Sequence, residues 1–418
     1  MVIAPLGGWG LSPQPGAQTS EHKNNNMNYN FDEIINRENT DAIKLERRKL
    51  LFGTDDVLPL WVADMDFRTP NFILDAIKKR IEHPVLGYTA TPANFFELFV
   101  AWTQKQHDWQ IETQWTGFVP GIVPALALAV QCFTKPGDEV IVQPPVYTPF
   151  MNIVNNNGRN LVFNPLKVTK GKFEMDFDDL RNKINEKTKM LILCNPHNPG
   201  GKVWSLETLK KLDELCAKHK ILVISDEIHA DMVLPGNSQI EHIPFAKVSR
   251  TAAENSVTFM SPSKTFNMPG LISSFYVIPN SKLYRQFASY LEASEVKFGN
   301  IFAYAATVAC YTEGNEWRKA MLHYVQENVD YVIGFLNTHI PQIKPMRPDA
   351  SFLLWLDCTA LGMESNELHR FFAQKAGIGL NQGTAFGPGG EYHLRLNVAC
   401  PKAVLEQAML QLKNALSV

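Results

Sequence analysis

Short apolar runs alternate with amphipathic segments through the middle of the chain. The runs, which are almost continuously aliphatic or β-branched, are residues 139–145, 189–195, 221–227, 257–261 and 273–279. Such runs are typical of strands that are covered on both faces of a sheet. Residues 205–220 repeat their apolar positions every three to four residues after a capping Ser205, which predicts an amphipathic helix. Repeated strand–helix–strand units predict an α/β fold with a mostly parallel central sheet flanked by helices.

Beyond residue 281 the pattern becomes mainly helical. It predicts a long helix over about 316–337, strands at 351–357 and 391–398, and a final helix from residue 402. We therefore expect a second, smaller α/β domain. The expected boundaries are an extension at 1–26, an N-terminal segment of the small domain at 27–75, a large domain at 76–315 and the C-terminal small domain at 316–418.

Charge and cysteine content narrow the class of protein. The net charge of −2 provides no basic field for nucleic acid or an anionic membrane. The six cysteines stand singly, which favours reduced thiols over disulfides or a metal site. The first 26 residues lack the features of a signal peptide, and Pro120 and Pro124 interrupt the longest apolar run. We expect a cytoplasmic enzyme with neither a nucleic-acid nor a membrane partner.

Lys264 follows the predicted strand at 257–261, within the sequence SPSKTFN. A lysine beside a buried strand is costly to bury unless its charge is paired or lost. A buried amine with a lowered pKa is what Schiff-base chemistry requires. By itself, however, the pattern favours an ordinary exposed lysine in a serine-rich turn.

Three further motifs follow a predicted strand or precede a helix. SDEIHAD places Asp226 at a strand end, where an acid could bind a metal, face solvent or pair with a cofactor nitrogen. NPHNPGG forms a tight turn that includes Asn198. Gly121 precedes an apolar helix whose first N–H groups could bind a phosphate. Each motif alone is also compatible with an ordinary turn.

Taken in order, the four motifs resemble those of the fold-type I pyridoxal-5′-phosphate (PLP) enzymes, the aspartate aminotransferase superfamily, from about residue 28 to 418. The resemblance implies PLP as cofactor, with Lys264 as the Schiff-base lysine and catalytic base. It implies that Asp226 pairs with the pyridinium nitrogen and that Asn198 binds the ring hydroxyl and lies near the substrate. Arg395, in LRLN, matches the arginine that forms two bonds to the substrate α-carboxylate.

The same resemblance assigns the remaining cofactor contacts. The backbone groups and hydroxyls expected around the phosphate belong to Gly121, Ile122, Val123, Ser261 and Ser263. Tyr147 matches the aromatic residue that stacks on the ring. Tyr88 matches a catalytic and cofactor-binding tyrosine that reaches into the neighbouring subunit's site, which implies a homodimer.

Two departures from the aminotransferase pattern bear on the reaction. His229 stands in the cofactor site where these enzymes usually carry a tyrosine, and Ile272 stands where many carry a phosphate-binding arginine. With WVADMDF at 61–67, these departures resemble the branch of cystathionine β-lyases and cysteine-S-conjugate β-lyases. By analogy with that branch, the backbone near Ala63 is expected to approach the substrate carboxylate.

The activity implied by this branch is the cleavage of cystathionine or a related cysteine S-conjugate to a thiol, pyruvate and ammonia. With cystathionine the thiol is homocysteine. A class I/II aminotransferase is the alternative. A PLP-fold transcriptional regulator is disfavoured, because the first 26 residues are too few and too rich in Gly and Pro to form a helix-turn-helix.

Overall fold

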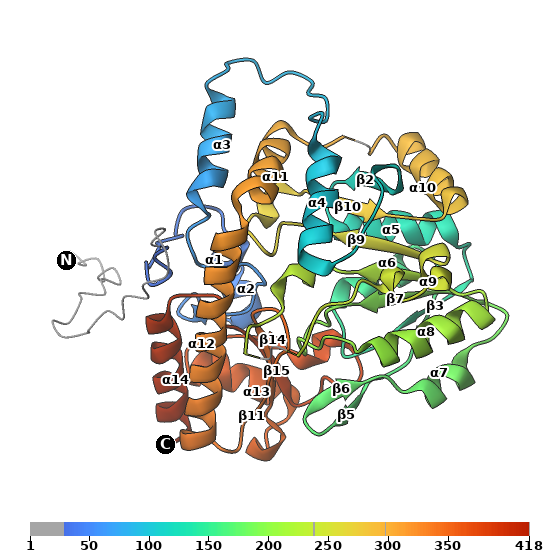
Figure 1. Ribbon diagram of the computed structural model, residues 1–418. Coiled ribbons are helices and arrows are strands. Elements are labelled where there is room, and N and C mark those ends of the chain that lie inside the picture. The colour runs from blue at the N-terminus through green and yellow to red at the C-terminus, as the bar shows by residue number, and fades with distance from the viewer. Residues whose placement is uncertain (1–28, 237–238, 297, 418) are drawn as a thin grey trace. The chain divides into compact units, whose positions relative to one another are not determined.

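The computed structural model describes residues 29–236, 239–296 and 298–417, so the expected extension at 1–26 lies outside the described residues. Within residues 31–418 a seven-stranded sheet lies between two layers of helices (Figure 1). In sheet order its strands are β2 (Thr116–Val119), β10 (Ser274–Val277), β9 (Ser256–Met260), β8 (Leu222–Asp226), β7 (Thr188–Cys194), β3 (Glu139–Val142) and β4 (Asn160–Phe163).

The sheet confirms the predicted mostly parallel arrangement. Strands β9, β8, β7, β3 and β4 pair in parallel with their neighbours in that order. Strand β10 is the exception, because it runs antiparallel to both β9 and β2. All five apolar runs form strands, and the helix predicted after Ser205 is α8 (Leu206–Lys218), where the Ser205 hydroxyl accepts a hydrogen bond from the Thr208 N–H at 3.2 Å.

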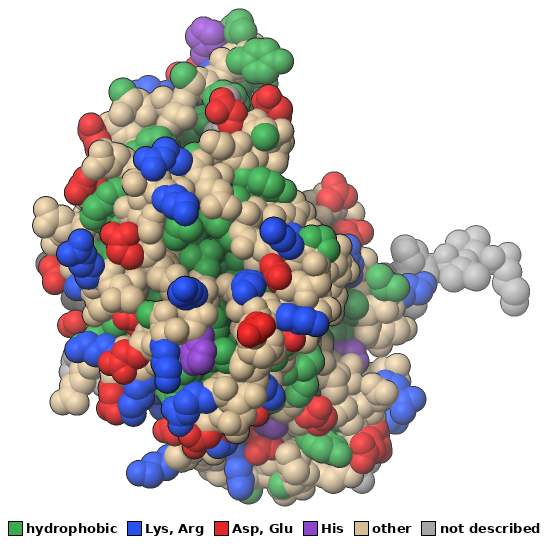
Figure 2. All heavy atoms as spheres, turned by 90° about the vertical axis from the view of Figure 1, so that its right-hand side faces the viewer, with side chains coloured by type: hydrophobic (Ala, Val, Ile, Leu, Met, Phe, Trp, Pro, Cys, Tyr) green, Lys and Arg blue, Asp and Glu red, His purple; other side chains and the backbone are tan. Residues whose placement is uncertain are grey.

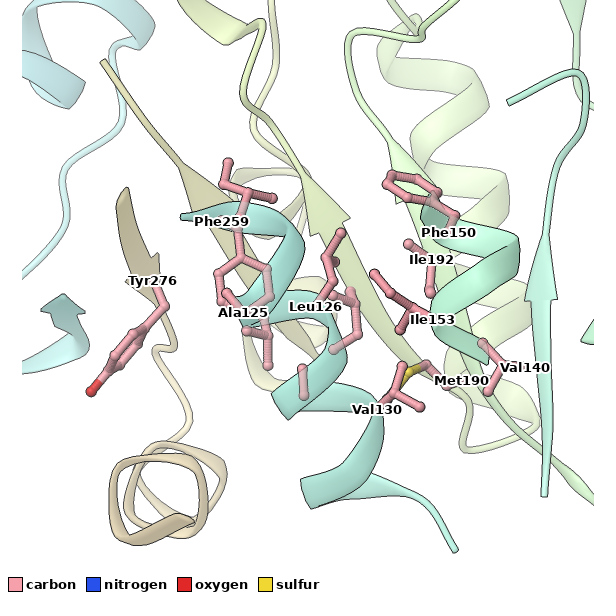
Figure 3. Close-up of a cluster of buried hydrophobic side chains, with 14 of the residues drawn as sticks. Ala125, Leu126, Val130, Val140, Phe150, Ile153, Met190, Ile192, Phe259 and Tyr276 are labelled. Atoms are coloured by element: carbon pink, nitrogen blue, oxygen red, sulfur yellow. The ribbon is translucent and has the colours of Figure 1, made fainter. Parts of the chain in front are cut away.

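Alternate side chains of the strands enter two hydrophobic cores, one on each face. Figure 3 shows the first core, where Leu126 and Val130 of α5 (Ile122–Phe133) and Phe150 of α6 (Thr148–Asn156) cover Met190 and Ile192. The second core is formed on the opposite face by α7 (Phe177–Lys183), α8 and α9 (Arg250–Glu254). Burial on both faces explains why the strands read as continuous apolar runs rather than alternating ones.

Four further helices belong to this part. They are α3 (Asn71–Ile81), α4 (Phe95–His107), α10 (Ser281–Ala293) and α11 (Ile301–Glu313), and both α3 and α4 pack against α11. The ring of Phe99 in α4 stacks on Phe275 of β10 with 4.2 Å between ring centroids, and both side chains are fully buried. This aromatic contact ties α4 to the antiparallel strand.

The C-terminal part is built from strands and helices, as the sequence predicted, and the structure shows that the strands of its sheet pair antiparallel. Its four strands are β11 (Lys344–Met346), β12 (Leu353–Asp357), β15 (His393–Asn397) and β14 (Asn381–Gln382), in sheet order. The long helix is α12 (Asn315–His339), and the last is α14 (Lys402–Leu416). The N-terminal strand β1 (Leu58–Pro59) pairs in parallel with β13 (Ile378–Gly379). The exact domain boundaries remain a prediction.

The described residues carry a mixed surface. Basic and acidic side chains are interspersed on the face shown in Figure 2, in line with the net charge of −2. Across the described part of the chain, no helix has the length and apolar character needed to span a bilayer.

Candidate active site

The candidate residues gather at one edge of the sheet, where adjacent parallel strands end. Strand β8 ends at Asp226, β7 is followed by the turn that contains Asn198, and β9 is followed by Ser261 to Lys264. Because β7, β8 and β9 are neighbours and run in the same direction, their carboxyl ends meet at this edge. Ligands of open α/β sheets bind in this position.

Lys264 is partly buried and its amine points into the site, so the simpler interpretation as an exposed lysine is wrong. Its Nζ donates a hydrogen bond to the backbone carbonyl of Ala63 at 2.6 Å. Burial lowers the pKa of Lys264 to about 8, with Asp64 and Asp226 opposing and Arg395 reinforcing the shift. An amine with this pKa is readily available as a nucleophile or base near neutral pH.

Asp226 is a buried acid that forms no ion pair with a basic side chain in the described part of the chain. Its side chain accepts a hydrogen bond from the Ile228 N–H at 3.1 Å and only 5% of the residue is exposed. Burial raises the pKa of Asp226 to about 7. A cationic ring nitrogen placed against this carboxyl would stabilise its ionised form, which is the role expected of Asp226.

Arg395 lies on β15, is 5% exposed, and has no carboxylate partner among the described residues. Its Nη1 donates to Asn198 Oδ1 at 3.1 Å, and its Nη2 donates to the Trp61 carbonyl at 2.8 Å and to Asn381 Oδ1 at 2.6 Å. Its Nε is buried and unpartnered in the described part of the chain. Burial lowers the pKa of Arg395 to about 10. A buried cation held only by neutral groups is suited to bind an anion.

Segment 61–67 joins the Lys264 turn to the Arg395 strand through its backbone. The side-chain amide of Asn267 accepts from the Met65 N–H at 3.0 Å and donates to the Phe67 carbonyl at 2.9 Å. Asn397 Nδ2 donates to the carbonyls of Val62 and Asp64, both at 2.6 Å. Sequence analysis missed both asparagines, although they stand in the same KTFN and LRLN motifs as Lys264 and Arg395.

The carbonyl oxygen of Ala63 accepts a hydrogen bond from the Lys264 amine. This contact places the Ala63 backbone at the site. Its approach to the substrate carboxylate stays a prediction, and a backbone N–H of this segment, not the occupied carbonyl oxygen, would have to provide it. The carbonyl that contacts the carboxylate-binding candidate Arg395 is that of Trp61.

The first turn of α5 has the geometry expected for a phosphate cradle, whose function stays a prediction. Gly121 has a φ of 93° and directly precedes the helix. The backbone N–H groups of Ile122 and Val123 lie in the first helical turn, where N–H groups have no partner within the helix. The Ser261 hydroxyl lies 2.8 Å from that of Ser263. A Cβ added to Gly121 would lie 3.1 Å from Cγ2 of Ile272, so residue 272 adjoins the cradle without contributing charge.

Tyr147 and His229 lie at the same site. Burial raises the pKa of the Tyr147 hydroxyl, and Arg395 and Asp226 are among the charges that act on it. His229 is 2% exposed, and its Nδ1 has no partner among the described residues. Burial, together with the charges of Lys264 and Arg395, lowers the pKa of His229 to about 3, so its imidazole is neutral at physiological pH.

Tyr88 is the one candidate that the structure does not bring to the site of its own chain. It is fully exposed, in the segment between α3 and α4. The other candidates include an amine, a buried carboxyl group, the free N–H groups at the start of α5 and a buried arginine. This donor set fits PLP and an amino-acid carboxylate. No group of three metal-ligating His, Cys, Asp or Glu side chains occurs in the described parts of the chain.

Residues 55–412 match the family model described as "Aminotransferase class I and II". The chain belongs to this family. Among its relatives, cystathionine beta-lyase PatB of Bacillus subtilis is 43% identical, over 93% of this chain and 100% of PatB. The fold-type I assignment is therefore confirmed.

Two solved structures of family relatives superpose closely on this chain. Cystalysin from Treponema denticola, whose structure contains a pyridoxal 5′-phosphate cofactor, is 33% identical with a TM-score of 0.90, over 94% of this chain and 99% of its own. The PLP-bound C-S lyase from Staphylococcus hominis is 35% identical with a TM-score of 0.87, over 94% of this chain and 99% of its own.

The lowered pKa of Lys264 predicts unusual reactivity in the cofactor-free protein. Labelling by acetic anhydride, followed by mass spectrometry, should reach half of its maximum at Lys264 near pH 8, because only the neutral amine reacts and burial lowers its pKa from 10.5 to about 8. The exposed Lys319 serves as the internal reference for the reagent. Labelling of Lys264 that starts only above pH 10 would contradict this environment for the amine.

Arg395→Lys should weaken the binding of amino acids by about 2 kcal/mol, roughly thirtyfold, because lysine cannot form two parallel bonds to a carboxylate. Spectroscopic titration of the cofactor-loaded protein with an amino acid and with the corresponding decarboxylated amine measures the effect. The amine, which lacks the carboxylate, should bind both proteins equally. An equal loss of affinity for both ligands would assign Arg395 to the architecture of the site alone.

Proposed function

We propose that the chain is a PLP-dependent carbon–sulfur β-lyase that cleaves cystathionine or a related cysteine S-conjugate to a thiol, pyruvate and ammonia. The single observation that carries the proposal is that one site contains both a buried Arg395 without a carboxylate partner among the described residues and the amine of Lys264. This pair can hold an amino acid by its carboxylate beside a base. The relatives named as a cystathionine β-lyase and a C-S lyase support this reaction type.

Each residue has a defined task in this proposal. Arg395 binds the substrate α-carboxylate and thereby orients the Cα–H bond toward Lys264. Lys264, held by the Ala63 carbonyl, removes the α-proton because its lowered pKa makes the neutral amine available. When bound, PLP supplies an electron sink at the α-carbon, and Asp226 opposes the ring nitrogen.

Asn198 and the cradle around Gly121 hold the cofactor in this proposal. Because Asn198 Oδ1 already accepts from Arg395 at 3.1 Å, its Nδ2 is the group left to bind the ring hydroxyl. The first turn of α5 and the hydroxyls of Ser261 and Ser263 bind the phosphate. Tyr147 covers one face of the ring.

β-Elimination is favoured over transamination by the two residues that depart from the aminotransferase pattern. Ile272 adjoins Gly121 and leaves the phosphate cradle without the arginine that many aminotransferases carry there. His229 is neutral and buried where a tyrosine is usual. Transamination remains the alternative reaction for this family, and the two are separated by their need for a keto acid.

We also infer that two copies of the chain form a homodimer with shared active sites. The segment between α3 and α4 extends away from the sheet at the top of Figure 1, and hydrophobic side chains gather at the same end in Figure 2. Its side chains Val85, Leu86 and Tyr88 are 61%, 62% and fully exposed. Apolar side chains at the tip of a projecting segment suit burial in a second subunit.

The free cysteine thiols support an inference about the cellular compartment of the protein. None of the six cysteines is in a disulfide in the structure, and only Cys132 is not buried. Free thiols in this number suit a reducing compartment, so we infer a cytoplasmic location.

The reaction type predicts product release without an acceptor. Incubation with cystathionine and PLP but no keto acid should release pyruvate and homocysteine in equal amounts over many turnovers, because each elimination restores the starting form of the enzyme. Pyruvate is measured with lactate dehydrogenase and the free thiol with a disulfide reagent. Lys264→Ala serves as the inactive control. Turnover that requires an added keto acid and releases no thiol would establish an aminotransferase instead.

Shared active sites predict complementation between two damaged subunits. Tyr88→Phe and Lys264→Ala should each lower activity as pure proteins. A refolded equimolar mixture should regain about a quarter of wild-type activity, because half of the dimers are hybrids and each hybrid holds one intact site. Native mass spectrometry of the mixture provides the control for exchange, because the two variant homodimers and the hybrid differ in mass. Activity of the mixture that equals the mean of the two pure variants would exclude a shared site.

A further inference from the structure

A second buried polar network lies outside the candidate active site and is centred on Asp231. This residue is 7% exposed and follows β8. Its Oδ1 lies 2.9 Å from His107 Nε2 and accepts from Trp102 Nε1 at 3.0 Å. Its Oδ2 accepts from the hydroxyl of Thr265 at 3.3 Å. One carboxylate therefore receives donors from helix α4 and from the turn that follows β9.

The charge of Asp231 is compensated where it lies. Burial alone would raise the pKa of Asp231, but the hydrogen bond and ion pair with His107, and the charge of Arg318, hold it below its usual value. Arg318 Nη1 also donates to the Asp231 carbonyl at 2.8 Å. An ionised carboxylate only accepts hydrogen bonds, so all three side-chain donors point toward it. A buried carboxylate that accepts hydrogen bonds from several side chains restricts the positions of the groups that it joins.

The network reaches the two residues on which the proposed chemistry depends. Thr265 directly follows Lys264, and its side chain is fully buried with Asp231 as its hydrogen-bond partner. Asp231 itself lies five residues after Asp226, in the segment that leaves the same strand. No direct hydrogen bond between the side chains of Lys264 and Asp226 is formed in the described residues. The contact between Thr265 and Asp231 therefore joins the segment after β8 to the turn after β9, beyond the point where the two strands pair through their backbones.

We propose that Asp231 is a positioning residue. It fixes the turn that carries Lys264 by accepting a hydrogen bond from the hydroxyl of Thr265. His107 and Trp102 in turn fix Asp231 from α4. The inference rests on the proposed function only in treating Lys264 as the reacting amine. It concerns the orientation of that amine, whichever amino acid is the substrate.

A cavity of about 360 Å³ gives experimental access to this network. It is lined by His107, Asp231, His242 and Arg318, among other residues. Truncation of His107 would enlarge this cavity beside the Asp231 carboxylate. The space then suits an imidazole molecule, which can donate the N–H that the truncated side chain no longer supplies.

The first test compares Thr265→Val with Thr265→Ser in the cofactor-loaded enzyme. Valine keeps the shape but removes the hydroxyl, so kcat should fall about tenfold with KM changed less than about twofold, in the range found when an outer-shell partner is removed. Serine keeps the hydroxyl and should restore kcat to within about threefold of wild type. Thermal unfolding confirms that both variants are folded.

A second readout separates this inference from the choice of substrate. The pH midpoint of the visible absorption band of the bound cofactor reports the position and surroundings of the Lys264 nitrogen. This midpoint should shift in Thr265→Val but not in Thr265→Ser. If cystathionine is not cleaved but the midpoint shifts, the proposed function fails and the positioning role stands. If the folded Thr265→Val variant keeps both the wild-type midpoint and the wild-type kcat, the positioning role is overturned.

The cavity allows an independent test by chemical rescue. His107→Ala should lose activity and show the same shifted midpoint, and added imidazole should restore both in a saturable manner. Wild-type enzyme and Thr265→Val, treated with the same imidazole concentrations, should show no gain. If His107→Ala does not fold, the Thr265 pair decides the question. A folded His107→Ala variant with wild-type activity and midpoint would show that His107 does not hold Asp231 for this purpose.

Discussion

The hydrogen bond from the Lys264 amine to the Ala63 carbonyl is the contact around which the site is assembled. It joins residues 201 positions apart at 2.6 Å. In the same segment, 61–67, the Trp61 carbonyl accepts a hydrogen bond from Arg395, which lies 334 positions further along the chain. Because peptide groups are rigid, the direction of these two carbonyls is set by the backbone between them. Asn267 and Asn397 hold that backbone, so Lys264 and Arg395 share one support.

An ion cluster anchors this support from the other side. Lys44, which is 2% exposed, lies 3.1 Å from Asp64 and 2.9 Å from Asp66, and Arg37 bonds both carboxylates at 2.7 Å. Burial alone would lower the pKa of Lys44, but the two carboxylates hold it above its ordinary value. Removing one member of such a buried pair typically costs about 3–5 kcal/mol. The energetic role of the cluster is therefore to keep segment 61–67 in a single conformation.

The active site shows the opposite electrostatic arrangement. There the pKa of Asp226 is raised to about 7, and those of Lys264 and Arg395 are lowered to about 8 and about 10, so burial pushes each group toward its neutral form. Charges left unpaired in this way reduce stability, and they accumulate where a ligand supplies the missing partner. In the function that we propose, a cationic ring nitrogen and a substrate carboxylate would supply the partners that Asp226 and Arg395 lack. In the cluster at Lys44 each charge has an oppositely charged partner, as suits a structural support. Asp226 and Arg395 lack such partners, as suits groups that bind a ligand.

The sequence by itself determined the fold class, the sheet strands and the identity of the chemical groups. The apolar runs at 189–195, 221–227 and 257–261 indicated buried strands. Their positions placed Asn198, Asp226 and Lys264 at strand ends, because local patterns report local structure. Tertiary structure decided which groups meet. Strand β10 runs antiparallel, Ala63 turns its carbonyl to Lys264, and Asp231 joins α4 to Thr265, and all of these depend on contacts between residues far apart in the chain. Hydrophobic periodicity carries no information on such contacts, because it records which face of an element is buried and not what covers it.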